Sequence, residues 1–147
     1  MALCGESNRT KMLVDEIGKQ FPADTFMNEV RLPVIRAALE LQRGNAAQAI
    51  DELKPTSRYE EAAEFWPPYL RGQAYLKLGR RTEAAAEFRK ILDHRGYAPF
   101  SPLYPLAQLG LARATENRKT YDEFLVIWKN ADEELPLLLS ARKEAEK

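Results

Sequence analysis

The sequence has few of the residues on which redox chemistry, disulfide bonding and most acid–base catalysis depend. It contains one cysteine, Cys4, which excludes an internal disulfide, and one histidine, His94. No apolar run approaches the roughly 20 residues of a membrane-spanning helix, and the N-terminus has no signal-peptide core. Lys and Arg number 22, as do Asp and Glu, so no excess positive charge attracts nucleic acid or an anionic membrane. We therefore expect a soluble protein with no nucleic-acid partner and no insertion into a membrane.

Neither the histidine nor the cysteine stands in a context that predicts catalysis. His94 lies at an expected helix end in the sequence LDHRG, and nothing nominates an acid or nucleophile as its partner. Cys4 lies near the N-terminus with no helix or base to activate it. Adjacent acids such as Asp15 and Glu16 diverge on a helix and cannot share a substrate atom. No HExxH, CxxC, Walker or EF-hand spacing occurs, so we predict no catalytic, cofactor-binding or metal-binding residue and no enzyme activity.

What the sequence does contain is a pattern of small, turn and large apolar positions that occurs twice. The two sets lie 35 residues apart and are Ala37, Gly44, Ala49 and Leu53, then Gly72, Gly79, Ala84 and Phe88. A single amphipathic helix, with a period of 3.6 residues, does not keep such a register. A supersecondary unit used twice does keep it.

The better-defined unit is PPYLRGQAYLKLGRRTEAAAEFRKILDHRG. Gly72 and Ala84 are small where two helices of a hairpin must approach closely, while Tyr75 and Phe88 fill the space beside them. Gly79 supplies the left-handed turn that ends the first helix. In the order and spacing of these positions the unit resembles the tetratricopeptide-repeat family, whose repeat is 34 residues long.

Local signals also predict where helices begin. Thr82 is placed to cap the second helix of that unit. Ser57 and Glu60 form a capping-box pattern that opens a short helical turn before the prolines. Ser101 and Pro102 are typical of a cap followed by the first helical residue.

The resemblance extends over nearly the whole chain. The runs RAALELQRGNAAQAIDEL, YLRGQAYL, AAEFRKILDHRG, SPLYPLAQLGLARA and FLVIWKNADEELP are similar to a tetratricopeptide segment of bacterial receptor-type proteins. Those proteins often place it C-terminal to a serine/threonine kinase domain or a winged-helix DNA-binding domain. The chain has no GxGxxG loop, HRD or DFG, so the resemblance implies only the sensor or interaction part of such a protein. Its compartment is then the cytoplasm by default, or the periplasm if the parent is a membrane-anchored receptor.

The fold implied is an all-α solenoid of stacked antiparallel helix pairs forming a single domain over residues 1–147. Its expected parts are a half repeat at 1–24, repeats at 25–56 and 57–97, a shortened repeat at 98–131 and a capping helix at 132–147. The half repeat matches the family at Gly5, Thr10, Val14, Ile17 and Pro22 but has no first helix. We therefore expect either that the chain is part of a longer protein or that another segment covers this face.

In this family the first helix of each unit lines a concave groove, which implies a protein scaffold that binds a protein or peptide segment. The matching positions are Arg31, Val34, Ala38, Leu41, Gln42, Trp66, Tyr69, Gln73, Leu76, Lys77, Leu106, Leu109 and Arg113. Their charges are all positive, which favours an acidic or carboxylate-bearing partner. The Lys/Asn clamp of chaperone-binding relatives is not reproduced, so chaperone binding is not implied. Trp66 has a second interpretation, in which it only covers the neighbouring hairpin.

An alternative function is that of a helical nucleic-acid-binding repeat. Basic residues are concentrated in one unit: Arg71, Lys77, Arg80, Arg81, Arg89, Lys90 and Arg95. Glu83, Glu87 and Asp93 interrupt them at helical spacing, which favours ion pairs within the helix over a nucleic-acid groove.

The third unit departs from the family after Ala114. About seven residues that would contain the Gly turn are missing, and no proline lies between 106 and 135. We therefore expect one fused helix over this range, whose apolar residues cannot return to their own chain and are covered by helix exchange in a homodimer. The residues assigned to self-association are Tyr121, Phe124, Leu125, Ile127 and Trp128. The competing interpretation is a monomer with a tight turn at Thr115 to Asn117.

Overall fold

Helical pairs follow one another along the chain. In the computed structural model, which describes residues 7–60, 63–97 and 100–146, every regular element is a helix, as the predicted all-α class requires. The α-helices are α1 (Ser7–Gln20), α2 (Leu32–Gln42), α3 (Ala46–Glu52), α4 (Trp66–Lys77), α5 (Arg81–Asp93), α6 (Leu103–Thr115), α7 (Arg118–Ile127) and α8 (Pro136–Ala145). Two short helices of other types are the π-helix η1 (Met27–Arg31) and the 3-10 helix η2 (Lys54–Arg58).

Left-handed glycines separate the helices of the first two pairs. Gly44 lies between α2 and α3 with φ +86°, and Gly79 lies between α4 and α5 with φ +71°. A residue with a Cβ atom is strained at such angles, which glycine adopts without steric cost. The two turns predicted from the repeated glycines are therefore confirmed.

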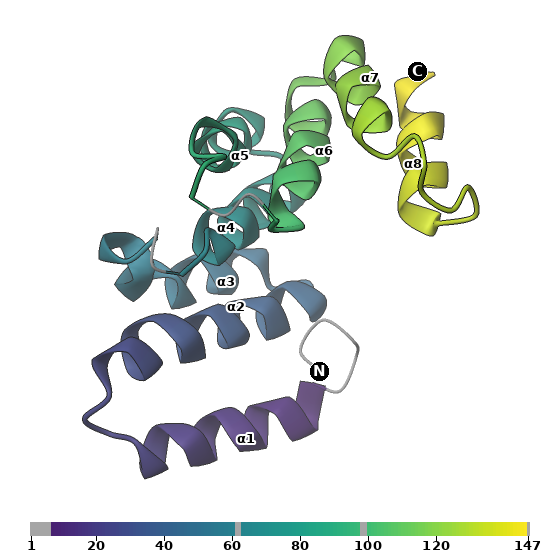
Figure 1. The fold of residues 1–147 in the computed structure, drawn as a ribbon. Helices are drawn as coiled ribbons and strands as arrows, with labels where there is room; N and C mark the ends of the chain where they lie inside the picture. Colours follow the sequence, from purple (N-terminus) through teal and green to yellow (C-terminus); the bar gives the residue numbers. More distant parts are fainter. Residues whose placement is uncertain (1–6, 61–62, 98–99, 147) are drawn as a thin grey trace.

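Each helix packs against its neighbours in sequence (Figure 1). Contacts join α2 to α3, α4 to α5 and α6 to α7, and further contacts of α3 with α4 and of α5 with α6 connect successive pairs. The first helices of the pairs also meet, since α2 contacts α4 and α4 contacts α6. At the N-terminal end α1 contacts α2, with Thr10 and Val14 buried, while Gly5 of the expected half repeat lies outside the described residues.

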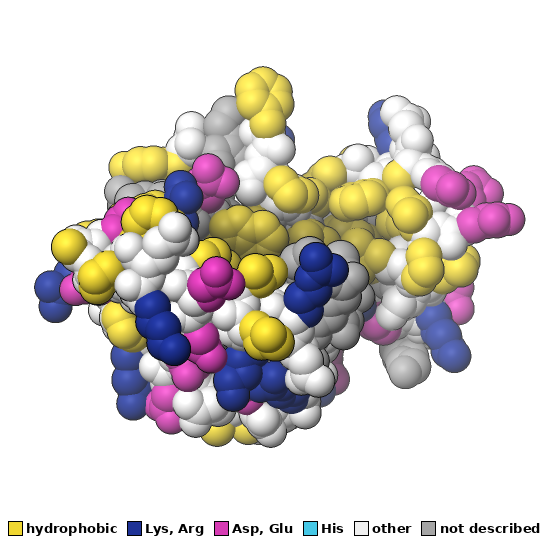
Figure 2. Space-filling view, turned by 90° about the horizontal axis from the view of Figure 1, so that it is seen from below, with side chains coloured by type: hydrophobic (Ala, Val, Ile, Leu, Met, Phe, Trp, Pro, Cys, Tyr) yellow, Lys and Arg dark blue, Asp and Glu magenta, His cyan; other side chains and the backbone are white. Residues whose placement is uncertain are grey.

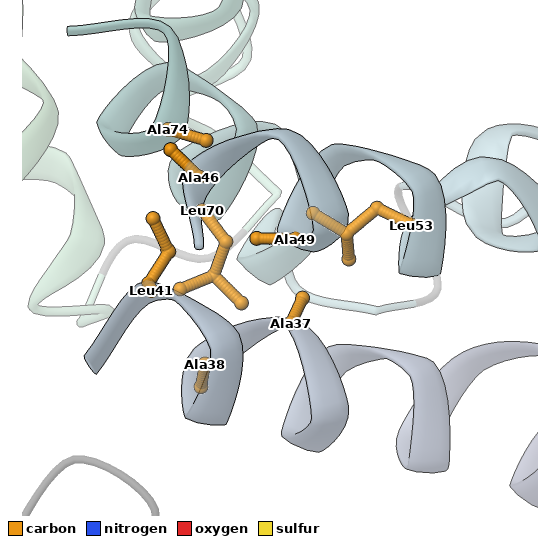
Figure 3. Close-up of a cluster of buried hydrophobic side chains, with 8 residues drawn as sticks. All are labelled: Ala37, Ala38, Leu41, Ala46, Ala49, Leu53, Leu70 and Ala74. Atoms are coloured by element: carbon orange, nitrogen blue, oxygen red, sulfur yellow. The ribbon is translucent and has the colours of Figure 1, made fainter. Parts of the chain in front are cut away.

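The first hydrophobic cluster shows why small residues recur in the pattern (Figure 3). Leu70 of α4 lies among side chains of α2 and α3, most of which are alanines. Alanine lets helix backbones approach closely while the larger leucines fill the remaining space. Its buried members are Ala37, Ala38, Leu41, Ala46, Ala49, Leu53, Leu70 and Ala74.

The second cluster is centred on Phe88 of α5, whose ring lies between two glycines. A Cβ atom added at Gly72 of α4 would lie 2.6 Å from Phe88 Cε1, and one at Gly110 of α6 would lie 2.5 Å from Phe88 Cζ. Phe88 is fully buried. Both neighbouring helices therefore present bare backbone to the ring, which confirms the close approach predicted at Gly72 and reveals a second one at Gly110.

The prediction of one fused helix over 106–135 is wrong. α6 ends at Thr115 and α7 begins at Arg118, so the chain turns at Glu116 and Asn117. α7 packs against its own α6, and α8 packs against α7. The competing interpretation, a tight turn at Thr115 to Asn117, is the one that the structure adopts.

The turn forms because Glu116 adopts the left-handed conformation that glycine usually supplies. Its φ is +50°, and its carboxylate pairs with the Arg81 guanidinium at 2.5 Å. Asn117 then caps α7 by accepting a hydrogen bond from the Thr120 N–H at 3.4 Å. Because a left-handed residue other than glycine has no distinctive sequence signal, the missing glycine led to the wrong expectation.

Replacing Glu116 by glycine is expected to stabilise the protein by a few tenths to about 1 kcal/mol, because glycine removes the steric cost of the positive φ. Urea unfolding followed by circular dichroism would measure the change. The matched control is Glu116→Ala, which loses the exposed Arg81 contact as the glycine variant does but keeps the strained backbone, and so should be less stable than the wild type. An alanine variant more stable than the glycine variant would contradict this account of the turn.

Candidate functional site

A pocket of about 290 Å³ lies between the start of α2 and the start of α4. Its apolar lining combines side chains from two stretches of sequence that are about thirty residues apart. It is lined by Phe26, Val30, Arg31, Val34, Ile35, Ala63, Glu64 and Trp66. The pocket thus joins three of the predicted groove residues, Arg31, Val34 and Trp66, to others that the sequence had not indicated.

One wall of the pocket is built on the π-helix η1. The Leu32 N–H donates to the Met27 carbonyl oxygen, five residues back, in the π-type pattern. The start of this segment is fixed by Asp24, whose Oδ1 accepts from the Met27 N–H at 2.8 Å. Asn28 Nδ2 donates to the carbonyl oxygens of Phe21 and Asp24 at 2.8 and 2.7 Å. Short π segments within helices are uncommon and occur frequently at functional sites.

The second stretch of the lining includes two consecutive left-handed residues, of which only Glu64 lines the pocket. Glu64 has φ +51° and Phe65 has φ +62°, an arrangement that costs about 1 kcal/mol or more for each residue. Phe65 is buried, with its ring 6.1 Å from that of Tyr97 in an edge contact. The strained pair directs the chain into α4, so that Trp66 reaches the pocket. Unusual backbone on both walls is the kind of feature that is retained at functional sites.

Trp66, which lines the pocket, contacts a second aromatic residue of α4. Trp66 and Tyr69 lie edge to face, with ring centroids 6.1 Å apart. Burial raises the pKa of Tyr69, and the nearby positive charge of Arg113 opposes this effect. The predicted groove residues Arg31, Val34, Trp66 and Tyr69 are therefore close together and only partly covered, except Arg31, which is exposed.

Several predicted groove residues are not available to a partner. Ala38, 5% exposed, and Leu41 are buried against α4. Leu109, 1% exposed, lies under α7 and α8. Their assignment to an exposed groove is wrong because the neighbouring helices cover them. Of the others, Gln73, Leu76 and Leu106 are half-buried, and Gln42 and Lys77 are exposed.

Arg113 was predicted to present a positive charge in the groove, but its guanidinium is hydrogen-bonded to the last helix, α8. Its Nε and Nη2 donate to the two carboxylate oxygens of Glu144 at 2.8 and 3.0 Å. Burial alone would raise the pKa of Glu144, but hydrogen bonds from Arg113 and Ser140 outweigh it and hold the pKa below its ordinary value. The same carboxylate accepts from the Tyr121 hydroxyl at 3.3 Å. α8 therefore covers the predicted groove at Arg113, while Leu106 of the same helix stays half-buried.

The residues assigned to helix exchange pack within their own chain. Tyr121 and Phe124 are buried against α6 and α8, and Leu125 and Trp128 are half-buried against the same cluster. Only Ile127, 48% exposed, faces solvent to a large extent. Helix exchange in a homodimer was predicted because one fused helix could not fold back on its own chain. The chain does fold back, at the turn formed by Glu116 and Asn117, so the reason for predicting the exchange no longer holds.

Most basic residues of the second unit form ion pairs or ring contacts with other residues of the same chain. Arg80 pairs with Glu83, Arg81 with Glu116, and both Arg71 and Lys90 with Glu60 and Glu87; Arg95 stacks on Tyr104. His94 lies at the end of α5, with Nδ1 2.7 Å from the Lys90 carbonyl oxygen. The ring therefore contacts a carbonyl oxygen in the last turn of α5, at the helix end that the sequence predicted.

Figure 2 shows hydrophobic side chains gathered in a hollow between the part of the molecule that carries α1 and α2 and the part that carries α8. Clustered apolar surface of this kind marks interaction sites more often than scattered single residues do. Partly buried apolar side chains of α4 and α6, Tyr69, Leu76 and Leu106 among them, pack at the surface of the second cluster. The molecule therefore presents apolar surface beyond the pocket itself.

No group of three or more histidine, cysteine or acidic side chains is arranged to hold a metal ion in the part of the chain that the structure describes. Within those same residues, no helix combines the length and the hydrophobicity that crossing a lipid bilayer requires. No family model, curated protein or solved structure matches this chain.

Five lining residues were not predicted from the sequence: Phe26, Val30, Ile35, Ala63 and Glu64. A signal for three of the lining residues was present, since Phe26, Val30 and Val34 recur at intervals of four and so share one face of a helix. No sequence pattern indicated Glu64, because the position of its side chain depends on the left-handed backbone before α4.

Proposed function

We propose that this chain is a non-catalytic interaction scaffold that binds a segment of a partner protein in the pocket between η1, α2 and α4. The observation that carries the proposal is an apolar pocket lined by an aromatic side chain from each of two stretches of sequence, Phe26 and Trp66. Aromatic side chains in such positions supply much of the energy in protein interfaces. Helices carry all the lining residues except Ala63 and Glu64, which limits the conformational entropy lost on binding.

We further propose that the helical pairs are repeats of the tetratricopeptide type and that the chain serves as the interaction part of a bacterial receptor-type protein. Support comes from the left-handed glycines at 44 and 79 and from the close packing of Gly72 on Phe88. The contacts of α2 with α4 and of α4 with α6 are also those of first helices that line one face.

Truncation of Trp66 is expected to weaken peptide binding about 30-fold or more, since an aromatic anchor contributes at least about 2 kcal/mol. The probe is a set of peptides selected from a random phage-displayed library on the wild-type chain. Their dissociation constants for wild type and Trp66→Ala would be measured by fluorescence anisotropy, with circular dichroism to verify folding.

The matched control is Phe100→Ala, because Phe100 is 98% exposed and lies outside the pocket. We expect this variant to bind the selected peptides as the wild type does. Peptides that bind Trp66→Ala with unchanged affinity, or that lose binding only in Phe100→Ala, would show that the pocket is not the binding site.

A further inference from the structure

We infer that the pocket selects a peptide segment in which one apolar side chain stands between an acidic and a basic residue. This inference rests on the proposed function and adds the chemistry of the partner. It depends on two opposite charges, Arg31 and Glu64, that lie among the apolar lining residues. The sequence favoured an acidic partner because all the predicted groove charges were positive. Glu64 in the lining adds the expectation of a basic residue in the partner.

The two charges come from the two stretches of sequence that line the pocket. Arg31 is the last residue of η1, and Glu64 is the first of the two left-handed residues before α4. Both side chains are exposed. A bound segment that contacts both stretches therefore meets the guanidinium of one and the carboxylate of the other.

Both charges are available to a partner. Across residues 7–60, 63–97 and 100–146, neither Arg31 nor Glu64 forms an ion pair. The Arg31 guanidinium lies over the Phe26 ring, with its carbon 5.4 Å from the ring centroid. Stacking on an aromatic face orients a guanidinium and leaves its N–H groups free at the edge, where a carboxylate binds in a bidentate manner.

Apart from these two charges the pocket lining is apolar. Phe26, Val30, Val34, Ile35 and Trp66 line it, and none of them offers a polar atom apart from the Trp66 indole N–H. An apolar side chain that enters displaces water from these surfaces, which provides most of the affinity. The charges at the two walls then set the direction and register of the segment, as charge complementarity does in other interfaces.

The test compares peptides selected from one random 12-residue library on the wild type, on Arg31→Glu and on Glu64→Lys. Wild-type selection is expected to enrich an acid and a base on opposite sides of an apolar residue. Selection on Arg31→Glu should replace the acid by a base, and selection on Glu64→Lys should replace the base by an acid. A wild-type peptide should bind Arg31→Glu about tenfold more weakly, and Lys in place of its acid should restore the affinity.

The matched control is Arg89→Glu, a charge reversal at an exposed arginine that does not line the pocket. It should select the same peptides as the wild type. Peptides that depend on Trp66 but carry no flanking charges, or that are unchanged by both pocket reversals, would overturn the inference and leave the proposed function standing. Peptides that bind independently of Trp66 would overturn both.

Discussion

Truncating Phe88 to alanine should lower the free energy of unfolding by about 3–5 kcal/mol. The ring is fully buried and lies between helices α4 and α6, so its loss opens a cavity where three helices meet. The flanking backbone cannot collapse into the space without moving whole helices. Urea unfolding followed by circular dichroism would measure the loss.

The same contact predicts that Gly110→Ala is destabilising by about 1–3 kcal/mol, although alanine is the better helix former by about 1 kcal/mol. The added Cβ would lie within 2.5 Å of the Phe88 ring, which is enclosed and cannot move aside. Gly72→Ala should behave alike, because its Cβ would meet the same ring at 2.6 Å.

A double-mutant cycle separates this steric effect from helix propensity. In a Phe88→Leu background the smaller side chain leaves room, so Gly110→Ala should be neutral or stabilising. If Gly110→Ala stabilised the protein with Phe88 intact, or cost the same in both backgrounds, the close contact would not be what requires glycine at this position.

Replacing Arg71 by methionine is expected to destabilise the protein by about 3 kcal/mol, because two carboxylates lose their buried partner. Arg71 is 8% exposed and donates to Glu87 Oε2 from Nε at 3.0 Å and from Nη2 at 2.8 Å. Its Nη2 also donates to Glu60, and Lys90 pairs with both acids. The network joins the segment before α4 to α4 and α5.

Arg81→Met is the matched control, since Arg81 forms an exposed ion pair with Glu116 and exposed pairs contribute little. Removing the acids together with Arg71, in the triple variant Arg71→Met, Glu60→Gln, Glu87→Met, should recover at least half of the lost stability. Chemical unfolding of all three variants would measure this. An Arg71→Met variant no less stable than Arg81→Met would show that the network contributes nothing to folding.

Individual capping residues predicted the helix starts less well than glycines predicted the turns. Thr82 was expected to cap α5, but the helix begins at Arg81 and Arg80 occupies the cap position without a side-chain hydrogen bond. Glu60 was expected to act in a capping box with Ser57, but it pairs with Arg71 and Lys90. Glu60 thus forms ion pairs with residues distant in sequence in place of a cap, and the local sequence does not indicate those partners.

The sequence by itself determined the helical class, the first two hairpin turns and the small residue, Gly72, that lets α4 approach Phe88. These features are local or recur at a fixed offset: glycine at 44 and 79 is required by a positive φ, and glycine at 72 by the ring beside it. Tertiary structure alone decided the turn at Glu116, where packing of α7 and α8 on α6 stabilises a backbone conformation that the local sequence disfavours. It also decided the pocket, because Arg31 and Glu64 come together only when α2 packs on α4, and no spacing along the chain records that contact.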